Sequence, residues 1–501
     1  MQELHTYNDV AAWLKSRVRG CLHTDSRQVT AGDGFIAWPG GVTDGRAYVP
    51  QAIQQGAAAC VVEREGLQAF EWAQEDKLNT QAVAAVADLK AQSGWIASAY
   101  FEHPSRQLQV LAVTGTNGKT STAWWLAHAL KNLNQRCAMV GTLGIGEAGQ
   151  LQLTGMTTPD PVLLQSRLKD FVVQGVQACA IEASSIGIAE HRLDGTHIRL
   201  AVFTNFTQDH LDYHGDMQRY WEAKKALFDW EGLPAAVINV DDAKGQILAE
   251  SLSQRKDFAL WTVGLQADAA RNQQHVCACE IEYTEHGLSF QVCEADEKVA
   301  LATQFVGAYN ISNLLGVVAA LRAMGYGLKD AVAACHHLPS VPGRMQVVTQ
   351  SPLVVVDYAH TPDAIEQAIV ALQPLAQMRG AQVTCVLGCG GDRDASKRPL
   401  MAAAAQQHAA HVVLTSDNPR SEDPMQILAH MQAGLKHTHN IQVIADRAQA
   451  IAQTIQAAHA QDVILLAGKG HEDYQEIQGV KHPFSDVAHA QRAVAQRRAH
   501  V

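Results

Sequence analysis

The sequence predicts an α/β protein of three domains, and three observations indicate this class. At 501 residues the chain is too long for one ordinary core, because domains average about 150 residues. From Leu111 onward, short apolar segments alternate with helical ones, which is the pattern of a mostly parallel sheet covered on both faces. After Leu338–Gln346, a segment with two prolines and a glycine, the alternation starts again and predicts a Rossmann-like C-terminal domain. With His103-Pro104 as the other boundary, the predicted domains are residues 1–105, 106–340 and 341–501.

The composition is that of a globular protein, with 47% hydrophobic and 18% charged residues. A formal net charge of −11 argues against a nucleic-acid partner for the whole surface. The sequence has no run of about 18 apolar residues, and residues 1–20 lack the apolar core of a signal peptide, so we expect no membrane span. The ten cysteines are scattered, and neither the C-x-C pair Cys277 and Cys279 nor Cys385 and Cys389 predict zinc. We therefore expect reduced thiols and a cytoplasmic protein.

In the first domain, residues 23–40 place turn residues between short β-type pieces, and the next segment fits loop, helix and strand. Ser26, Arg27 and the turn at Gly40 and Gly41 have the polarity to hold a phosphate or a sugar. Ordinary loop chemistry explains the same residues, and from this segment alone it is the simpler interpretation.

The central domain is organised around Leu111–Thr122, which reads LAVTGTNGKTST. An apolar strand, a glycine-containing loop, Lys-Thr and a helix follow one another, which is the order of a phosphate site. Its spacing departs from the usual P-loop, because Val113 stands where the first glycine belongs and the glycine is at Gly115. An ordinary strand-to-helix turn explains two glycines but not Gly-Lys-Thr at a helix start. We therefore predict a P-loop-type ATPase domain that binds a nucleoside triphosphate.

Polar residues follow several predicted strands of this domain at the point where each strand ends. Glu182 follows one strand, Thr204 and Asn205 follow another, and Asp241 and Asp242 follow a third. Ligands in open α/β sheets bind beyond the carboxyl ends of the strands, so we expect one shared cleft. The predicted strands are Leu111–Val113, Cys137–Val140, Ala178–Ile181, Leu200–Phe203 and Ala235–Val240.

The segment Phe203–Phe228 concentrates carboxylate, imidazole and lysine side chains. For an isolated histidine, an ordinary polar loop and a solvated lysine face would be the better explanation. After a strand of a nucleotide-binding domain, one histidine and Glu182 become candidate Mg²⁺ ligands, although imidazole is an unusual partner for a hard cation. The side chains are those of Asp209, His210, Asp212, His214, Lys224 and Lys225.

Residues 280–306 predict irregular β structure. The following helix places Asn310 and Asn313 on one face, where they either read a base edge or cap and pack the helix.

In the C-terminal domain, four successive strands each end in polar residues. One such strand end is commonplace, but four favour a ligand-binding rim over a solvated edge. The rim residues are Asp357, His360, Asp392, Arg393, Asp394, Asp417, Asn418, Arg420, Lys469, His471 and Glu472.

These motifs resemble the Mur ligase family of ATP-dependent amide-forming synthetases, which build the peptide of bacterial cell-wall precursors. The resemblance implies three domains, which bind the UDP end of the substrate, ATP and the incoming amino acid, and it implies a monomer with small-molecule substrates. It spans nearly the whole chain in order, through the motifs TGTNGKTST, TTPDP, EASS, FTNFTQDHLDYHG, YWEAKKALF, DYAHTPD, GCGGDRD-x-x-KRPLM, DNPR and GKGHEDYQ.

The implied reaction joins UDP-N-acetylmuramoyl-L-alanyl-D-glutamate to a diamino acid while ATP becomes ADP and phosphate. The γ-phosphoryl group passes to the D-glutamyl carboxylate, and the amine attacks the resulting acyl phosphate. A carboxylate is a poor electrophile because it is anionic; phosphorylation neutralises it and supplies a leaving group. Catalysis then depends mainly on positioning and charge neutralisation.

The resemblance also implies roles for individual residues. Lys119, His210 and Lys224 are the implied catalytic residues, and Lys224 is implied to be carbamylated by CO₂ so that it can hold a second Mg²⁺. The implied metal ligands are Thr120, Glu182, His210 and Lys224. The implied ATP ligands are Gly115, Thr116, Asn117, Gly118, Lys119, Thr120, Ser121, Asn310, Asn313, Arg344, Asp357 and His360.

For the UDP-sugar substrate, the chain departs from the family pattern at two positions. Ile186 stands where the family often has histidine, and Glu190 stands where it often has glutamine, so a hydrogen bond is lost or changed at each. The implied contacts are Thr24, Ser26, Gly41, Val42, Thr43, Thr157, Thr158, Ser184, Glu190 and Arg192.

The DNPR motif, Asp417–Arg420, indicates which amino acid is added. Meso-diaminopimelate has a second carboxylate at its far end, which needs a cationic fork such as Arg420. Lysine has no such carboxylate and would leave that charge unpaired, at a cost of about 1–3 kcal/mol. In the family DNPR accompanies diaminopimelate, so this amino acid is implied and lysine is the alternative. The implied contacts are Arg393, Asp417, Asn418, Pro419, Arg420, Gly468 and Glu472.

Two alternative interpretations assign the chain a different function from this ligase reaction. A folylpolyglutamate synthase shares the ATPase core but is not expected to have DNPR together with GKGHEDYQ. A P-loop ATPase that couples hydrolysis to movement or assembly predicts ATP turnover without any amino-acid requirement.

Overall fold

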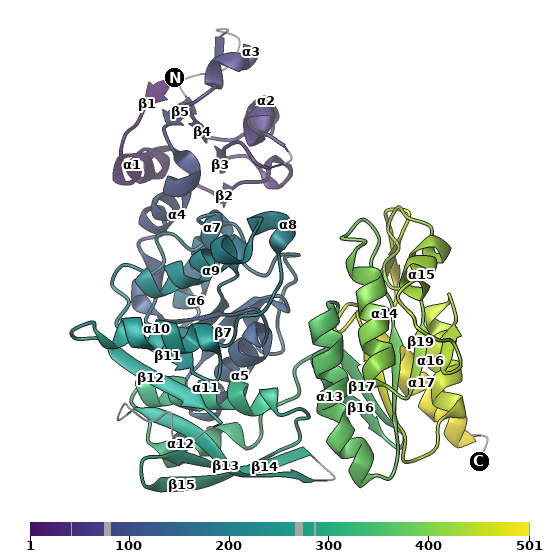
Figure 1. Ribbon diagram of the computed structural model, residues 1–501. Helices are drawn as coiled ribbons and strands as arrows, with labels where there is room; N and C mark the ends of the chain where they lie inside the picture. Colours follow the sequence, from purple (N-terminus) through teal and green to yellow (C-terminus); the bar gives the residue numbers. More distant parts are fainter. Residues whose placement is uncertain (42, 75–81, 266–273, 285–286, 500–501) are drawn as a thin grey trace. The chain divides into compact units, whose positions relative to one another are not determined.

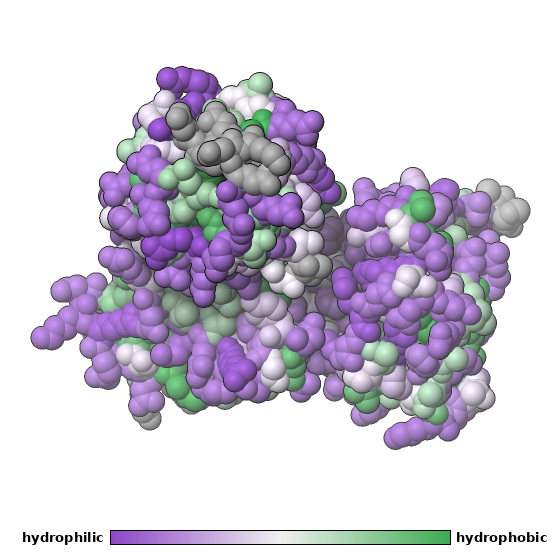
Figure 2. Space-filling model, turned by 90° about the horizontal axis from the view of Figure 1, so that it is seen from above, coloured by the Kyte–Doolittle hydropathy of each residue, from purple (hydrophilic) through white to green (hydrophobic). Residues whose placement is uncertain are grey.

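The computed structural model describes residues 1–41, 43–74, 82–265, 274–284 and 287–499 (Figure 1). Val42, one of the implied substrate contacts, lies outside the described residues. The chain forms two compact units, Met1–Val263 with Ala319–Tyr326, and Gly264–Val318 with Gly327–Val501. Among the helices of the described segments, none is both long and apolar enough to cross a membrane. The face in Figure 2 is mostly hydrophilic, with hydrophobic residues in small patches.

The N-terminal part of the first unit is a parallel sheet in the order β1-β5-β4-β3-β2. Both of its faces are covered, so β4 is buried at every position: Val61 packs with Trp13 and Ile96, and Val62 packs with Val49 on the opposite face. The strands are β1 (Gln2–Glu3), β2 (Leu22–His23), β3 (Gly34–Ala37), β4 (Ala59–Glu63) and β5 (Val83–Val86), and the helices are α1 (Tyr7–Arg17), α2 (Val49–Gln54), α3 (Glu71–Gln74) and α4 (Leu89–Tyr100).

The same unit contains a second sheet, in the order β12-β11-β10-β6-β9-β7-β8, which is parallel except for the β7–β8 hairpin. Its strands are β6 (Gln109–Thr114), β7 (Cys137–Gly141), β8 (Gly144–Glu147), β9 (Ala178–Glu182), β10 (Leu200–Phe203), β11 (Ala235–Asn239) and β12 (Ala259–Gly264). Its helices are α5 (Lys119–Asn132), α6 (Pro161–Val173), α7 (Ser185–Ala189), α8 (Leu211–His214), α9 (Met217–Lys225) and α10 (Ala243–Ser253). The predicted strands of this domain are confirmed to within a few residues.

The second unit begins with an antiparallel ladder of β13 (His275–Thr284), β14 (Gly287–Glu294) and β15 (Glu297–Thr303). The predicted β structure of residues 280–306 is confirmed, but the described pairing is regular except for a bulge between Cys279 and Glu282. The regularity comes from hydrogen bonds between strands, which the composition of each strand does not reveal. Two helices follow, α11 (Tyr309–Ala323) and α12 (Leu328–Cys335).

The C-terminal sheet has the order β16-β17-β21-β18-β19-β20, with only the β16 edge antiparallel. Apolar clusters cover both faces, as expected of a Rossmann-like sheet, and the predicted α/β class is confirmed. The strands are β16 (Gln346–Gln350), β17 (Leu353–Asp357), β18 (Val383–Leu387), β19 (His411–Leu414), β20 (Ile441–Val443) and β21 (Val463–Ala467), followed by the hairpin β22 (Tyr474–Ile477) and β23 (Val480–Pro483). The helices are α13 (Pro362–Met378), α14 (Lys397–His408), α15 (Pro424–Gln432), α16 (Arg447–Ala457) and α17 (Asp486–Ala499).

Candidate functional site

The phosphate loop connects β6 to α5, and glycine is required at its two glycine positions for different structural reasons. Gly115 has φ +146°, and a Cβ at this position would collide with Oγ1 of Thr204. Gly118 has φ +84°, a left-handed conformation that favours glycine, and α5 begins at the next residue. The loop therefore needs glycine at 115 because the end of β10 approaches it closely.

The loop is anchored by the residues after β10. Asn205 accepts the Asn117 N–H at its Oδ1 (2.8 Å) and the Thr116 N–H at its backbone oxygen (2.9 Å). These two implied phosphate donors are thus bonded to the protein in this structure. The first-turn amides of Thr120 and Ser121 have no acceptor within the helix and point along its axis, so they are the better backbone donors for an anion.

Lys119 lies over its own loop. Its Nζ donates to the carbonyl oxygens of Gly115 and Thr116, both at 2.9 Å. The ammonium group is therefore held beside the loop and the start of α5, where an anion would bind.

Glu182, at the end of β9, is the buried carboxylate of the site, with 1% of its surface exposed. Its Oε2 accepts a hydrogen bond from Oγ1 of Thr120 at 2.8 Å, and its Oε1 accepts the Thr142 N–H at 2.7 Å. Gly141 leaves room for this carboxylate, which a Cβ there would meet. The side-chain oxygens of Thr120 and Glu182 are the type of ligand that Mg²⁺ prefers, so these two residues fit a magnesium ion.

Lys224 on α9 is 1% exposed, and its Nζ donates to the Gly115 carbonyl at 2.7 Å and lies 4.5 Å from the ring centroid of Tyr220. Burial, with a smaller effect of the nearby Lys119 charge, holds the pKa of Lys224 well below its usual value. The neighbouring Lys225 is 44% exposed and pairs with Asp229. The two lysines of the helix therefore have different environments, and only Lys224 faces the loop.

His210 is the N-cap residue of the short helix α8, with a left-handed backbone of φ +52°, and its Nε2 lies 3.5 Å from Asp209 Oδ2. Burial lowers the pKa of His210, Asp209 raises it, and the charges of Lys119 and Lys224 lower it further. His210 therefore lies close enough to Lys119 and Lys224 for both charges to act on it, and its role as a metal ligand stays a prediction.

Several implied substrate contacts form one network beside Glu182. Thr158 Oγ1 donates to the Glu182 carbonyl at 2.7 Å and lies 2.9 Å from Ser184 Oγ. Arg192 Nη1 donates to the Thr158 carbonyl at 2.9 Å, and Thr157 Oγ1 lies 3.0 Å from Thr142 Oγ1. The structure thus brings the TTPDP and EASS motifs together.

Glu190, one of the two departures from the family pattern, is paired. Its carboxylate lies 2.7 Å from Lys90 Nζ and also accepts a hydrogen bond from the Tyr213 hydroxyl at 2.5 Å. Burial acts to raise the pKa of Glu190, but the hydrogen bonds from Lys90 and Tyr213 outweigh burial and lower the pKa. Lys90 therefore compensates the charge that glutamate introduces here.

The N-terminal substrate contacts lie around β2 and the loop after β3. Burial raises the pKa of Asp160, and hydrogen bonds from Leu163 and the Thr24 side chain oppose this effect, so Thr24 lies beside the TTPDP motif. Ser26 donates to Gln51 at 3.3 Å. Thr43 closes the turn at Gly41 by accepting the Gly40 N–H at 2.9 Å.

The implied adenine and ribose contacts lie in the second unit. Asn310 donates to the Val306 carbonyl at 2.7 Å and accepts from Asn313 at 3.3 Å, so the two asparagines share a helix face as predicted. Arg344 stacks on the Tyr358 ring at 4.5 Å, and His360 Nδ1 lies 2.8 Å from the Tyr358 carbonyl.

Asp357 ends β17 and accepts the N–H groups of Met345 (2.7 Å) and Ala359 (2.8 Å). Burial raises the pKa of this carboxyl, while the Arg344 charge and the two N–H donors oppose the shift. Asp357 thus ties the segment that carries Arg344 to the end of the strand.

Lys469 organises the C-terminal rim. Its side chain is fully buried, and its Nζ donates to Asn418 Oδ1 at 3.0 Å and to Glu472 Oε2 at 3.1 Å, and lies 3.6 Å from Asp417 Oδ1. Gly468, with φ +113°, precedes it after β21. One ammonium group therefore holds three implied amino-acid contacts together.

Replacing Lys469 by methionine is expected to lower the free energy of unfolding by about 1–3 kcal/mol, because buried oxygen atoms lose their donor. The Km for the amino-acid substrate should rise at least tenfold, since Asn418 and Glu472 lose their common partner. Thermal melts and amino-acid titrations measure the two effects. An unchanged Km in a folded variant would contradict the organising role, and Lys481→Met, in the exposed strand β23, is the control.

Arg420 follows Pro419, which is buried, and has a left-handed backbone with φ +51°. Its Nη1 donates to the Gly391 carbonyl at 2.6 Å, and its Nε lies 3.6 Å from Glu476 Oε2. Its side chain is 20% exposed, whereas Arg393 is exposed and donates to the Asp392 carbonyl at 3.4 Å. The guanidinium of Arg420 is thus oriented by the GCGGDRD loop and β22.

The same loop is held by Arg398, whose guanidinium donates to both carboxylate oxygens of Glu422 at 2.7 and 2.8 Å and to the Gly390 carbonyl at 3.3 Å. The Arg398 charge and hydrogen bonds lower the pKa of Glu422 from 4.5 to about 2. A lowered carboxyl pKa stabilises the fold fully above pH 4.5, and this stabilisation is lost as the pH falls toward 2.

Glu422→Gln is therefore expected to lower the Tm at pH 7, and the difference from the wild type should shrink to about half or less at pH 3. Calorimetric melts across this pH range measure it. Glu250→Gln, at an exposed position of α10, should show no such pH-dependent difference, and a constant difference for Glu422→Gln would contradict the argument.

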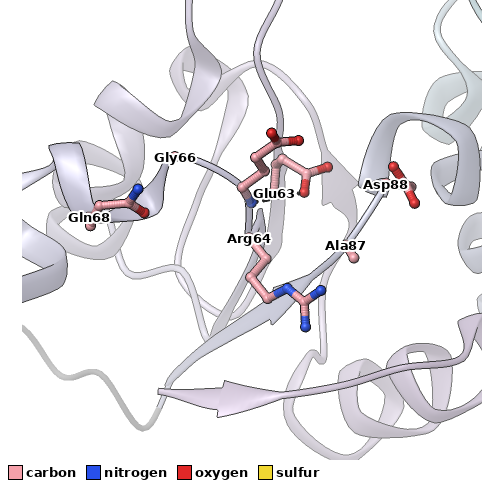
Figure 3. Close-up of a pocket in the computed structure, with 7 residues that line it drawn as sticks. Glu63, Arg64, Gly66, Gln68, Ala87 and Asp88 are labelled. Carbon is pink, nitrogen blue, oxygen red and sulfur yellow. Dashed lines mark hydrogen bonds between the residues drawn. The ribbon is translucent and has the colours of Figure 1, made fainter.

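A cavity of about 430 Å³ lies at the carboxyl ends of β4 and β5 (Figure 3). It is lined by Glu63, Arg64, Glu65, Gly66, Gln68, Ala87 and Asp88. The Glu63 carboxylate accepts the N–H groups of Glu65 (3.1 Å) and Leu89 (2.7 Å), so it stabilises the start of α4. Among the predicted site residues that the structure describes, none lines this cavity.

Four residues to which the resemblance assigned no role contact the implied site residues. Asn205 and Thr142 bind the loop and Glu182, Tyr220 lies under Lys224, and Lys469 holds the C-terminal rim. Asn205 and Lys469 were among the polar residues at strand ends, so that signal was present in the sequence.

A parallel sheet with a strand–glycine–lysine–helix loop, and a buried carboxylate beside that loop, defines the class of P-loop-type nucleotide-binding α/β proteins. The chain belongs to the Mur ligase family. The family's catalytic domain matches residues 20–100, its middle domain matches residues 113–321, and its glutamate ligase domain matches residues 343–470.

The chain is 54% identical over 506 residues to a UDP-N-acetylmuramoyl-L-alanyl-D-glutamate--2,6-diaminopimelate ligase of Acidovorax sp. (strain JS42). The match covers 99% of both chains. It is 46% identical to the protein of the same name from Janthinobacterium sp. (strain Marseille), over 97% of this chain and 96% of that one. A solved structure of a ligase of that name has a TM-score of 0.65 and 35% identity, with 95% of each chain covered.

More distant structures share the fold. The MurF ligase of Thermotoga maritima in complex with ADP has a TM-score of 0.65 at 18% identity and covers 97% of this chain and 99% of that chain. A folylpolyglutamate synthase of Mycobacterium tuberculosis has a TM-score of 0.60 at 17% identity, over 81% of this chain and 95% of that one.

Proposed function

We propose that this protein is an ATP-dependent ligase that joins meso-diaminopimelate to the D-glutamyl carboxylate of UDP-N-acetylmuramoyl-L-alanyl-D-glutamate in peptidoglycan precursor synthesis. The name of the relatives that match across the whole chain supports this substrate pair. The observation that carries the proposal is the hydrogen bond of the buried Lys224 amine to Gly115, which joins the α9 motif of the family to the phosphate loop. The proposal includes a monomer that acts in the cytoplasm on small molecules, with no nucleic-acid partner.

The first unit supplies the groups for phosphoryl transfer. Lys119 and the first-turn amides of α5 bind the phosphates of ATP and counter the charge that builds up as the γ-phosphoryl group moves to the D-glutamyl carboxylate. The UDP-linked substrate is held beside the γ-phosphoryl group by Thr157, Thr158 and Ser184. The amine of the incoming amino acid then attacks the acyl phosphate, the C–N bond forms, and phosphate leaves with the C–O bond electrons.

Thr120, Glu182 and His210 would hold one Mg²⁺, which neutralises phosphate charge when bound. Lys224 would hold a second one only after reaction with CO₂, because an ammonium group repels the metal and a carbamate oxygen binds it. Carbamylation needs the neutral amine, and the lowered pKa of the buried Lys224 supports that form. The exposed Lys225 lacks this environment.

The C-terminal rim would bind the amino acid. Arg420 pairs with the far carboxylate of diaminopimelate, and Asn418 and Glu472, both held by Lys469, bind its polar far end. Lysine as substrate offers no carboxylate to Arg420, which is the physical basis for the preference.

The test is phosphate release from ATP in the presence of the UDP-muramoyl dipeptide with meso-diaminopimelate, with lysine, or with no amino acid. Release that depends on diaminopimelate is the expected result. Equal release with lysine would keep the ligase and reject the role of Arg420. Release without either amino acid would contradict the ligase and favour an uncoupled ATPase.

A further inference from the structure

Three cysteine thiols meet on the antiparallel ladder of the second unit. Cys277 on β13 lies directly opposite Cys293 on β14, and Cys279 lies two residues along β13, on the same face. The Sγ atoms of Cys279 and Cys293 are 2.6 Å apart. The C-x-C pair of the sequence thus gains a third thiol from the next strand, and Cys293 is in reach of both members.

The surroundings of the three thiols differ. Cys277 and Cys293 are buried, and Cys279 is partly exposed, so a small solute reaches Cys279 first. Lys298 lies opposite Cys293 on β15, and its Nζ is 3.0 Å from Glu280 Oε1. Burial raises the pKa of Cys293 to about 12 and raises that of Cys277, and the Lys298 ammonium opposes both shifts. The cluster therefore has an accessible thiol, a partner in contact with it and a nearby cation that favours thiolates.

We propose that Cys279 and Cys293 are a redox site that closes to a reversible disulfide when the protein meets a hydroperoxide. Cys279 Sγ attacks the peroxide oxygen, the O–O bond breaks, and an alcohol or water leaves, so that Cys279 becomes a sulfenic acid. Cys293 Sγ then attacks that sulfur, the S–S bond forms, and the hydroxyl group leaves as water with the thiol proton. Two thiols are oxidised by two electrons and one hydroperoxide is reduced.

Cys277 gives the site a second arrangement. Its thiolate attacks Cys293 Sγ by thiol–disulfide exchange, which moves the bond to the directly opposed pair and releases Cys279. Either bond joins β13 to β14, so the oxidised ladder cannot open at this point. A thiol reductant reverses the reaction by the same exchange.

The test uses the full-length protein, reduced, freed of reductant and treated with tert-butyl hydroperoxide. After alkylation and digestion, mass spectrometry should find one cross-link between the peptides of Cys279 and Cys293, with exchange product at Cys277. Thiols titrated in denaturant should fall by two from the ten of the sequence and return with dithiothreitol. Ten remaining thiols, or disulfides formed only by cysteines outside the cluster of Cys277, Cys279 and Cys293, would overturn the proposal.

Two matched variants separate the cluster from general oxidation. Cys293→Ser should retain all of its remaining thiols under the same treatment, whereas Cys60→Ser, a buried cysteine of β4, should form the cross-link as the wild type does. Lys298→Met should slow cross-linking severalfold relative to Lys329→Met, an exposed position on α12. Cross-linking of Cys277 to Cys279 in Cys293→Ser would overturn the assignment, and circular dichroism checks that each variant is folded.

Discussion

Replacing Lys224 by alanine is expected to reduce turnover by about 10²–10³-fold or more, the loss seen when one preorganised group that stabilises a transition state is removed. The variant should stay folded, because alanine removes a buried polar group and leaves the apolar contacts of Tyr220 and Trp221 on α9 in place. The substrate Km values should change much less than kcat, since the proposed carbamate acts on charge that builds up during phosphoryl transfer. Steady-state kinetics with all three substrates measure this.

The adjacent lysine provides a matched control for this prediction. Lys225→Ala removes the same side chain from the exposed side of α9 and should keep turnover within about twofold, because an exposed ion pair such as that with Asp229 contributes little. Short carboxylic acids such as acetate should partly restore Lys224→Ala, since they supply the oxygen ligands that the carbamate would provide. Wild-type activity of Lys224→Ala would remove this lysine from the mechanism.

Replacing Arg420 by alanine is expected to raise the Km for meso-diaminopimelate by about 30-fold or more, because loss of one partner of a hydrogen-bonded charge pair costs about 2–5 kcal/mol. Binding of ATP should be unchanged, since Arg420 contacts only the GCGGDRD loop and the β22 region in the described residues. Arg420→Lys keeps the charge but not the paired donors, so its Km for meso-diaminopimelate should lie between the values of the wild type and of Arg420→Ala.

The control for this variant is Arg492→Ala, at an exposed position on α17, which should leave every Km unchanged. A Km increase of equal size for ATP, the UDP-substrate and diaminopimelate in Arg420→Ala would indicate a folding defect and contradict the specificity role. Thermal melts of both variants distinguish these cases, because the loss of the Gly391 contact alone should lower the Tm only slightly.

The sequence was sufficient for the α/β class and for the position of most strands. Strands buried on both faces, such as β9 and β11, are apolar at nearly every position, and each is followed by polar residues at the edge where ligands bind. The Gly-Lys-Thr signature was also sufficient to locate the loop between β6 and α5, because the strand, the loop and the helix start are consecutive in the chain. The β structure predicted for 280–306 is confirmed, but its regular pairing was not predicted, because the pairing of β13, β14 and β15 depends on neighbouring strands.

Only the tertiary structure decided which side chains meet. The Asn117–Asn205 hydrogen bond that holds the loop spans 88 positions, the Thr120–Glu182 hydrogen bond spans 62, and the Lys224–Gly115 hydrogen bond spans 109. The same holds for Cys293, which turns a C-x-C pair into a three-thiol cluster. Local preference determines where a strand or loop lies, but these contacts depend on the order and register of strands in a sheet, which hydrogen bonds between distant segments determine.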